Sequence, residues 1–143
     1  MIKVKEILAE KGTEVISVKP DTLVFDALKV MAEKDIGAVL IMEDDKMVGI
    51  FSERDYARKV SLRGKSSRKS YVSEFMTRRI YYCSPDTTSR ECLTLMTEKR
   101  SRHLPVLNEG KLSGLITIGD VVNKIILDQK HTIKYLEDYI VGG

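Results

Sequence analysis

The chain of 143 residues contains one sequence pattern twice, and this duplication constrains the fold more than any other feature. An offset of 65 residues places Pro20-Asp21-Thr22 on Pro85-Asp86-Thr87, and without any gap it later places Asp55 on Asp120. An ungapped duplication of this length predicts two copies of one supersecondary unit. Because a unit this small cannot close a core alone, we expect the copies to pack together with approximate twofold symmetry.

Hydrophobic patterning gives the same order of elements in both copies: strand, helix, strand, strand, helix. In the first copy these are expected at residues 15–18, from Val24 onward, at 38–42, at 47–51 and from Asp55 onward. The predicted fold class is therefore α/β (α+β), with two tandem β-α-β-β-α repeats.

Helix starts are marked by polar residues. Asp21 and Thr22 are expected to supply side-chain oxygens to the N-terminus of the first helix. In the second copy, Thr88 followed by Glu91 fits a capping box. Both copies are therefore predicted to begin their first helix just after the Pro-Asp-Thr sequence.

The repeats divide the chain into segments. We expect one module over 1–143, made of a first repeat (3–60), a basic linker or mobile loop (61–70), a second repeat (71–127) and a C-terminal helical tail (128–143). Residues 72–76 precede the second copy much as 4–8 precede the first. In the tail, one helical face carries Ile133, Leu136, Tyr139 and Ile140. This stripe predicts packing against the protein itself or against a second subunit.

Composition narrows the class of protein. Lys and Arg number 24 against 21 Asp and Glu, a surplus that does not require a nucleic-acid partner. The linker contains four basic residues, Arg63, Lys65, Arg68 and Lys69. They are compatible with a solvated loop or with a clamp for a phosphate tail or RNA. No apolar run approaches the ~20 residues that span a bilayer. The start lacks an apolar signal region, which predicts a protein of the cytoplasm or an organelle matrix.

The chain shows no sequence motif of a catalytic site or a metal site. Nucleophile elbows, HExxH, phosphate-binding loops and dinucleotide fingerprints do not occur. Cys83 and Cys92 have neither a CxxC partner nor a histidine at metal-ligand spacing, so we expect them to be small buried residues. We therefore expect that the protein is not an enzyme and that it binds no catalytic cofactor and no metal.

One polar motif occurs in both copies: Gly, two apolar residues, Ser or Thr, two residues of any type, and Asp. It occurs at 49–55 and 114–120. Ser52 and Thr117 could be helix caps, with Asp55 and Asp120 as first-turn acids that suit the helix dipole. Alternatively, each helix start and hydroxyl could hold a phosphate while the carboxylate accepts hydrogen bonds from ribose hydroxyls. Local chemistry alone leaves both interpretations open.

Taken together, the repeated motifs resemble those of the cystathionine β-synthase (CBS) domain pair, also called a Bateman module. The resemblance covers roughly residues 3–127 and rests on both Gly-to-Asp motifs and on the segments Lys19–Thr22, Ser84–Thr87, Ile36–Val39 and Arg102–Val106. It implies a regulatory module that senses an adenine nucleotide in the cleft between the repeats. AMP is the first candidate, and ADP, ATP, NAD and S-adenosylmethionine share its base and ribose contacts.

The resemblance also implies two ligand sites. The first would comprise Ser52, Asp55, Ile50, Ile80, Tyr81, Arg102, His103 and Pro105, with Arg54 nearby. The second would comprise Thr117, Asp120, Val15, Ile16, Gly37 and Ala38. Arginine and histidine side chains in the first site can make charge-assisted bonds to phosphate. The second lacks them, and we expect it to bind weakly, to take a nucleoside or to stay empty.

The implied partners are a second copy in a homodimer and a regulated protein that the sequence does not name. One alternative is a structural or interaction scaffold without a nucleotide, and another is a nucleic-acid-binding accessory protein that uses the basic linker. A further alternative, an enzyme built on a barrel of about 250 residues, is disfavoured because this chain is far shorter.

Overall fold

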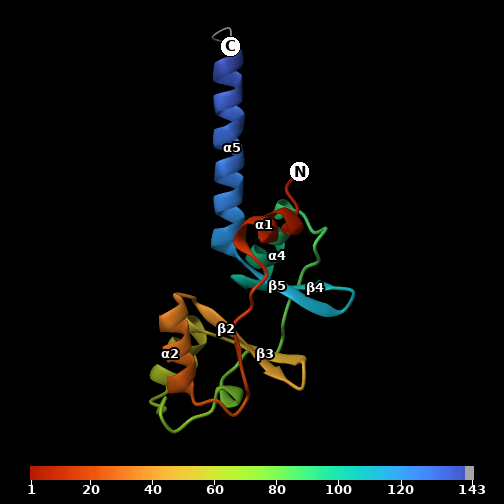
Figure 1. Cartoon of the computed structure of the whole chain (residues 1–143). Helices are drawn as coiled ribbons and strands as arrows, with labels where there is room; N and C mark the ends of the chain where they lie inside the picture. The colour runs from red at the N-terminus through yellow and green to blue at the C-terminus, as the bar shows by residue number, and fades with distance from the viewer. Residues whose placement is uncertain (141–143) are drawn as a thin grey trace. The chain divides into compact units, whose positions relative to one another are not determined.

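The computed structural model describes residues 1–140, which form two compact units (Figure 1). Unit 1 combines Met1–Glu14 with the chain from Tyr81 onward, and unit 2 is Val15–Ile80. None of the described helices combines the length and apolar character needed to cross a membrane.

Unit 2 contains the first sheet. Its elements are β1 (Ser17–Val18), α2 (Val24–Lys34), β2 (Ala38–Glu43), β3 (Lys46–Ser52), the short helix α3 (Glu53–Asp55), the π-helix η1 (Tyr56–Ser61) and the 3₁₀ turn η2 (Val72–Glu74). The strand order is β1-β2-β3, with β1 parallel and β3 antiparallel to β2. The apolar stripe of α2, including Val24, Ala27 and Met31, packs with Phe51 of β3 in the core of this unit.

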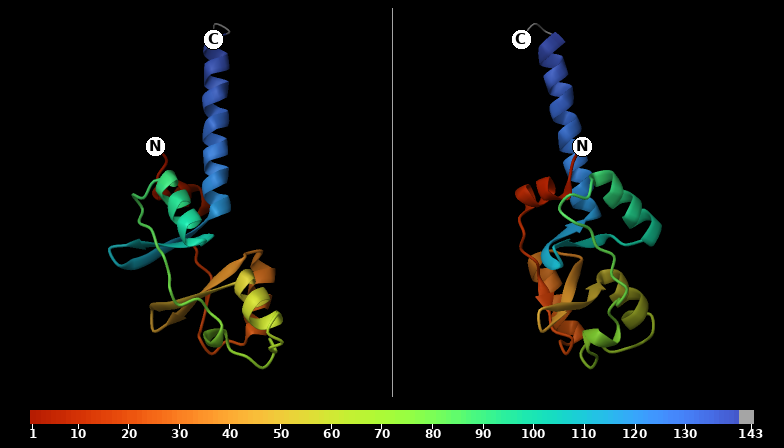
Figure 2. Two further views of the ribbon diagram at one scale, coloured as in Figure 1. Left: turned by 180° about the vertical axis from the view of Figure 1, so that it is seen from behind. Right: turned by 90° about the vertical axis from the view of Figure 1, so that its right-hand side faces the viewer.

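Unit 1 contains the second hairpin and three helices. Its elements are α1 (Val4–Lys11), α4 (Ser89–Lys99), β4 (His103–Asn108), β5 (Lys111–Thr117) and α5 (Ile118–Ile140), which the two views of Figure 2 show from different sides. Cys92 and Met96 of α4 pack on Leu104 and Ile116 of the β4-β5 hairpin. Cys83 and Cys92 are both buried and not in a disulfide, which confirms the prediction that they are buried.

The duplication extends to the register of the strands. Ala38 pairs with Ser52, and at the same offset His103 pairs with Thr117. The irregularity between Ile41 and Met42 likewise recurs, between Val106 and Leu107. The predicted α/β architecture with two copies of one unit is therefore confirmed. The expected first strand of the second copy is reduced to a single parallel bridge, Cys83 to Val106.

Two glycines show how the segments before each repeat are packed. A Cβ on Gly49 would clash with Met76 Sδ, and one on Gly114 would lie 2.8 Å from Leu8 Cδ2. Only glycine permits these approaches. Met76 follows η2 and packs on the first repeat, whereas Leu8 of α1 packs on the second. Each compact unit is therefore completed by the segment that precedes the other repeat in sequence.

The expected cap of the first helix is wrong. Helix α2 begins at Val24, and neither Asp21 nor Thr22 serves as its N-cap. Instead, the N–H groups of Val24 and Phe25 donate to main-chain carbonyls of the linker, Ser70 O and Ser67 O, both at 2.9 Å. Arg68 also lies 4.0 Å above the Phe25 ring. The second half of the linker is therefore held to α2 by main-chain hydrogen bonds and a cation–π contact. The capping box of Thr88 and Glu91 is confirmed.

The tail is not a separate element, because α5 runs without a break from the second repeat to Ile140. Ile133, Leu136, Tyr139 and Ile140 are between 50% and 80% exposed. Packing of this stripe on the protein itself, one of the two expectations, is therefore wrong. Gly142 and Gly143 of the predicted tail lie outside the described residues.

Candidate ligand-binding motifs

In the first motif, strand β3 ends at Ser52 and helix α3 begins at the next residue. The Asp55 N–H donates to Ser52 Oγ at 3.1 Å, and the Ser52 N–H donates to Asp55 Oδ2 at 3.0 Å. These reciprocal bonds form a capping box. The capping interpretation of this motif is thus confirmed, because serine and aspartate satisfy the free N–H groups at the helix start.

The Asp55 carboxylate takes part in further interactions that the sequence did not reveal. Oδ2 also accepts from Ser52 Oγ at 3.0 Å, while Oδ1 accepts from Thr77 Oγ1 at 2.9 Å and lies 3.0 Å from Lys59 Nζ. Asp55 is only 8% exposed. A carboxylate offers about four acceptor positions, and these contacts occupy them. A ribose hydroxyl could bind Asp55 only by displacing a donor such as Thr77.

The second motif repeats the cap but surrounds its acid differently. The Asp120 N–H donates to Thr117 Oγ1 at 3.1 Å, and the Thr117 N–H donates to Asp120 Oδ2 at 2.8 Å. Lys11 of α1 also donates to Oδ2 and to the Leu115 carbonyl. No described residue donates to Asp120 Oδ1, and the side chain is 23% exposed. Asp120 therefore keeps an acceptor position that Asp55 lacks.

These contacts set the protonation of Asp120. Partial burial by itself raises the pKa of the Asp120 carboxyl. The hydrogen bonds from Lys11 and Thr117, together with the positive charge of Lys11, outweigh this effect and hold the pKa below its ordinary value. Asp120 is thus a carboxylate at neutral pH and able to accept hydrogen bonds. It lines a small hollow of about 190 Å³ between α1 and α5.

Within each unit, the strand-entry residues lie beside the motif of the same repeat. The Glu53 N–H donates to the Gly37 carbonyl at 3.0 Å, and the Ile118 N–H donates to the Arg102 carbonyl at 3.0 Å. Gly37 and Ala38 are therefore placed next to the first motif, and Arg102 and His103 next to the second. Each predicted ligand site, by contrast, combines the motif of one repeat with the strand-entry residues of the other repeat. Both ligand sites therefore remain predictions.

The remaining predicted residues lie on strands or next to them, except Arg54, which lies in the short helix α3. Half-buried positions are Val15, Ile16, Ile50, Ile80 and Tyr81, while Arg54 and Arg102 are exposed. The Tyr81 ring has the Lys99 ammonium 5.4 Å from its centroid. Pro105 is buried in β4, and its carbonyl accepts from the Cys83 N–H at 3.0 Å.

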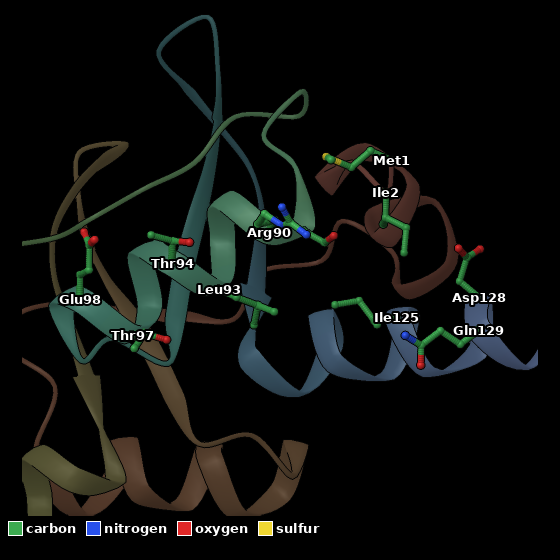
Figure 3. Close-up of a pocket in the computed structure, with 11 residues that line it drawn as sticks. Met1, Ile2, Arg90, Leu93, Thr94, Thr97, Glu98, Ile125, Asp128 and Gln129 are labelled. Atoms are coloured by element: carbon green, nitrogen blue, oxygen red, sulfur yellow. The ribbon is translucent and has the colours of Figure 1, made fainter.

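Unit 1 also contains a larger hollow that the sequence did not predict. It has a volume of about 790 Å³ and lies between the N-terminal residues, α4 and α5, where Leu93 and Ile125 contribute apolar side chains (Figure 3). Its lining comes from segments far apart in the chain, so no local pattern could have marked it. The predicted site residues contribute nothing to this lining. Among the described residues, no cluster of His, Cys, Asp and Glu is placed to hold a metal ion.

Comparison with known proteins gives a consistent result. The sequence profile of the CBS domain matches residues 4–62 and 72–127. The chain is 34% identical over 128 residues to the mitochondrial CBS domain-containing protein CBSX3 of Arabidopsis thaliana, covering 86% of this chain and 62% of that protein. The chain thus spans less than two thirds of that relative.

Solved structures show the same fold. A protein with CBS domains from Burkholderia ambifaria MC40-6 is 48% identical with a TM-score of 0.86, over 89% of this chain and 96% of that chain. The CBS domain pair of protein MJ0100, solved in complex with 5′-methylthioadenosine and S-adenosyl-L-methionine, is 21% identical with a TM-score of 0.75, over 87% of this chain and 96% of that chain.

Proposed function

The chain belongs to the CBS-domain family, and we propose that this pair of repeats is a ligand-sensing regulatory module that binds an adenine nucleotide, with AMP as the first candidate. The observation that supports this most is the Asp120 carboxylate at the start of α5, which is ionised, partly exposed and has one oxygen without a described donor. Such an oxygen can accept hydrogen bonds from ribose hydroxyls. The MJ0100 pair holds two adenosine-containing ligands, which supports the same class of ligand here.

We assign the binding residues as the sequence predicted them. Ser52 and Asp55 would act with Arg102 and His103, and Thr117 and Asp120 with Gly37 and Ala38. Arginine and histidine favour the first set for a phosphate, because they form charge-assisted bonds with its oxygens. The occupied acceptor positions of Asp55 argue against ligand binding at this first set of residues. Binding there requires that the ligand replace one of the donors to Asp55, such as the Thr77 hydroxyl, whereas Asp120 needs no such exchange.

The mechanism we propose is a population shift. A ligand that holds residues of both repeats favours one arrangement of the protein, and a regulated protein that recognises this arrangement responds to the nucleotide level. The module acts as a homodimer without catalytic activity, in the cytoplasm or an organelle matrix. A scaffold without nucleotide is the second candidate, because the saturated contacts of Asp55 are also what a purely structural cap requires.

A thermal-shift panel tests the proposal. AMP, ADP, ATP, NAD, GMP and S-adenosylmethionine are added to the wild type, to Asp55→Asn and to Asp120→Asn. A ligand at a hundred times its dissociation constant adds about 2.7 kcal/mol, which raises Tm by roughly 5–10 °C for a chain of this size. Each variant is compared with its own ligand-free Tm, so that a change in stability is not read as a change in binding.

A shift lost only in Asp55→Asn assigns the nucleotide to the set with Arg102, and one lost only in Asp120→Asn assigns it to the other set. Absence of a shift with every adenine ligand refutes the nucleotide proposal and leaves the scaffold.

A further inference from the structure

Helix α5 carries an exposed apolar stripe along most of its length. Figures 1 and 2 show its second half extending beyond α1 and α4 of the same unit. The exposed fractions are 40% for Val122, 42% for Ile126, 56% for Ile133, 50% for Leu136 and 80% for Ile140. A stripe of this kind on a soluble helix marks a surface that another apolar surface covers.

The spacing of the stripe is that of a coiled coil. Ile126, Ile133 and Ile140 are seven residues apart and occupy one heptad position, a; Val122, Gln129 and Leu136 occupy the other, d. β-Branched residues at a favour two-stranded parallel coils. The pattern begins inside unit 1 and runs to the end of the described helix.

The isoleucines of the stripe point away from the core of unit 1, whereas Gln129 borders the hollow between α5, α4 and the N-terminal residues. On a helix of 3.6 residues per turn, Val121 and Lys124 lie on the side opposite to Ile126 and Ile133. Val121 is fully buried in the core of unit 1, and Lys124 forms an ion pair with Glu10 of α1. A second helix can therefore reach the stripe without displacing α1 or the core.

The second half of α5 has no packing partner among the described residues. Residues 128–140, roughly 20 Å of helix, are exposed at every position. Isolated helices shorter than about 12–15 residues are marginal in water, and most helices in proteins depend on packing of an apolar face. Within the described residues of this chain nothing covers that face.

We propose that α5 pairs in parallel with α5 of a second copy of this chain. Each a residue then meets its own equivalent, as does each d residue, in six layers from Val122 to Ile140. With the exposed fractions above, the stripe and Tyr139 offer roughly 400–600 Å² of apolar surface per helix. The pair buries about 1,000 Å² in total, the lower limit for a specific interface.

Charge selects the parallel arrangement. In the antiparallel arrangement that keeps all six layers, Lys130 at heptad position e lies opposite the partner's Lys130, which is repulsive. In the parallel arrangement, Lys130 flanks the partner's Ile125, and Glu137 flanks the partner's Thr132. No like charges meet. The two Gln129 amides face each other and can exchange hydrogen bonds, which fixes the register.

Light scattering or sedimentation over a range of concentrations tests the pairing. We expect a dimer for the wild type and an increase of at least 100-fold in its dissociation constant for Ile133→Asp, since two carboxylates then face each other in an apolar layer. Lys134→Asp, one residue further on and outside the stripe, is the matched control and stays dimeric. A monomeric wild type, or an Ile133→Asp variant as dimeric as the control, overturns the proposal.

Cysteine crosslinking tests the orientation. Oxidised Ile133→Cys forms a disulfide between two copies if the helices are parallel, whereas Tyr135→Cys, on the opposite side of the helix, does not. A dimer in which Ile133→Cys fails to crosslink overturns the parallel arrangement. The inference rests on the proposed homodimer but not on the ligand. Repeating the AMP thermal shift on Ile133→Asp separates the two, because a monomer that still binds AMP leaves the sensor proposal intact.

Discussion

Replacing Asp55 with asparagine tests whether the first motif is held by the four donors that converge on its carboxylate. Ser52 N–H and Oγ donate to one oxygen, and Thr77 Oγ1 and Lys59 Nζ contact the other. An asparagine side chain keeps the shape but has one acceptor oxygen and one NH₂ group. In either orientation of the amide, the NH₂ group faces two donors. A largely buried donor left without an acceptor costs about 1–3 kcal/mol, and hydrogen bonds to a charged group are worth about 1.5–3 kcal/mol.

We therefore expect Asp55→Asn to lower the free energy of unfolding by about 2–3 kcal/mol, which is roughly 5–10 °C in Tm. The matched control is Asp120→Asn. Its amide oxygen can still accept from the Thr117 N–H while the NH₂ group takes the side where no described residue donates, so the expected loss is about 1 kcal/mol. Urea unfolding followed by circular dichroism gives both values without ligand. Equal losses in the two variants, or no loss in Asp55→Asn, would refute the argument from saturated acceptors.

Three further predictions concern stability and reactivity. Because the pKa of Asp120 is lowered in the folded protein, its contribution is complete above about pH 5 and is lost as pH falls through the folded value; the stability difference between wild type and Asp120→Asn should shrink on acid titration, and a constant difference would contradict this. Gly49→Ala should cost about 1–3 kcal/mol in urea unfolding by crowding the side chain of Met76, and Met76→Ala in the same chain should recover part of the loss. Cys83 is buried, and its pKa is raised by hydrogen bonding with Cys92 and by burial, so it should react with a thiol reagent on the order of 100-fold more slowly in the folded than in the unfolded protein.

Much of the fold could be predicted because it depends on local patterns that occur twice. Strand pairing in both hairpins, the buried face of α4 and the box of Thr88 with Glu91 follow from spacing of apolar and capping residues. The cap of α2 could not be predicted in this way. Its acceptors are the main-chain carbonyls of Ser67 and Ser70, and every residue type has such a carbonyl. The hydrogen bonds that hold the basic linker to α2 could not be predicted for the same reason.

The candidate site shows the same limit. The Ser/Thr-to-Asp spacing correctly indicated Ser52 and Thr117 as possible helix caps, since each cap and its acid lie within one turn of helix. It gave no information on Thr77 or Lys11, which reach the acids from other segments. Lys59 illustrates the point within the repeat: its equivalent at the 65-residue offset is Lys124, which pairs with Glu10 and not with Asp120. Identical residues at identical positions therefore make different contacts.

The segments that precede the repeats explain this divergence. Thr77 follows η2 and closes the first motif, whereas Lys11 ends α1 and reaches the second. Both segments lie outside the part of the chain that duplicates most closely, so they are free to differ while the repeats keep the same fold. One supplies a neutral hydroxyl that completes the shell around Asp55; the other supplies a charge that keeps Asp120 ionised and leaves an oxygen open. A chain with two copies of one motif can thus hold one acid mainly for structure and keep the other available to a ligand, and the pair of variants at Asp55 and Asp120 separates these two roles.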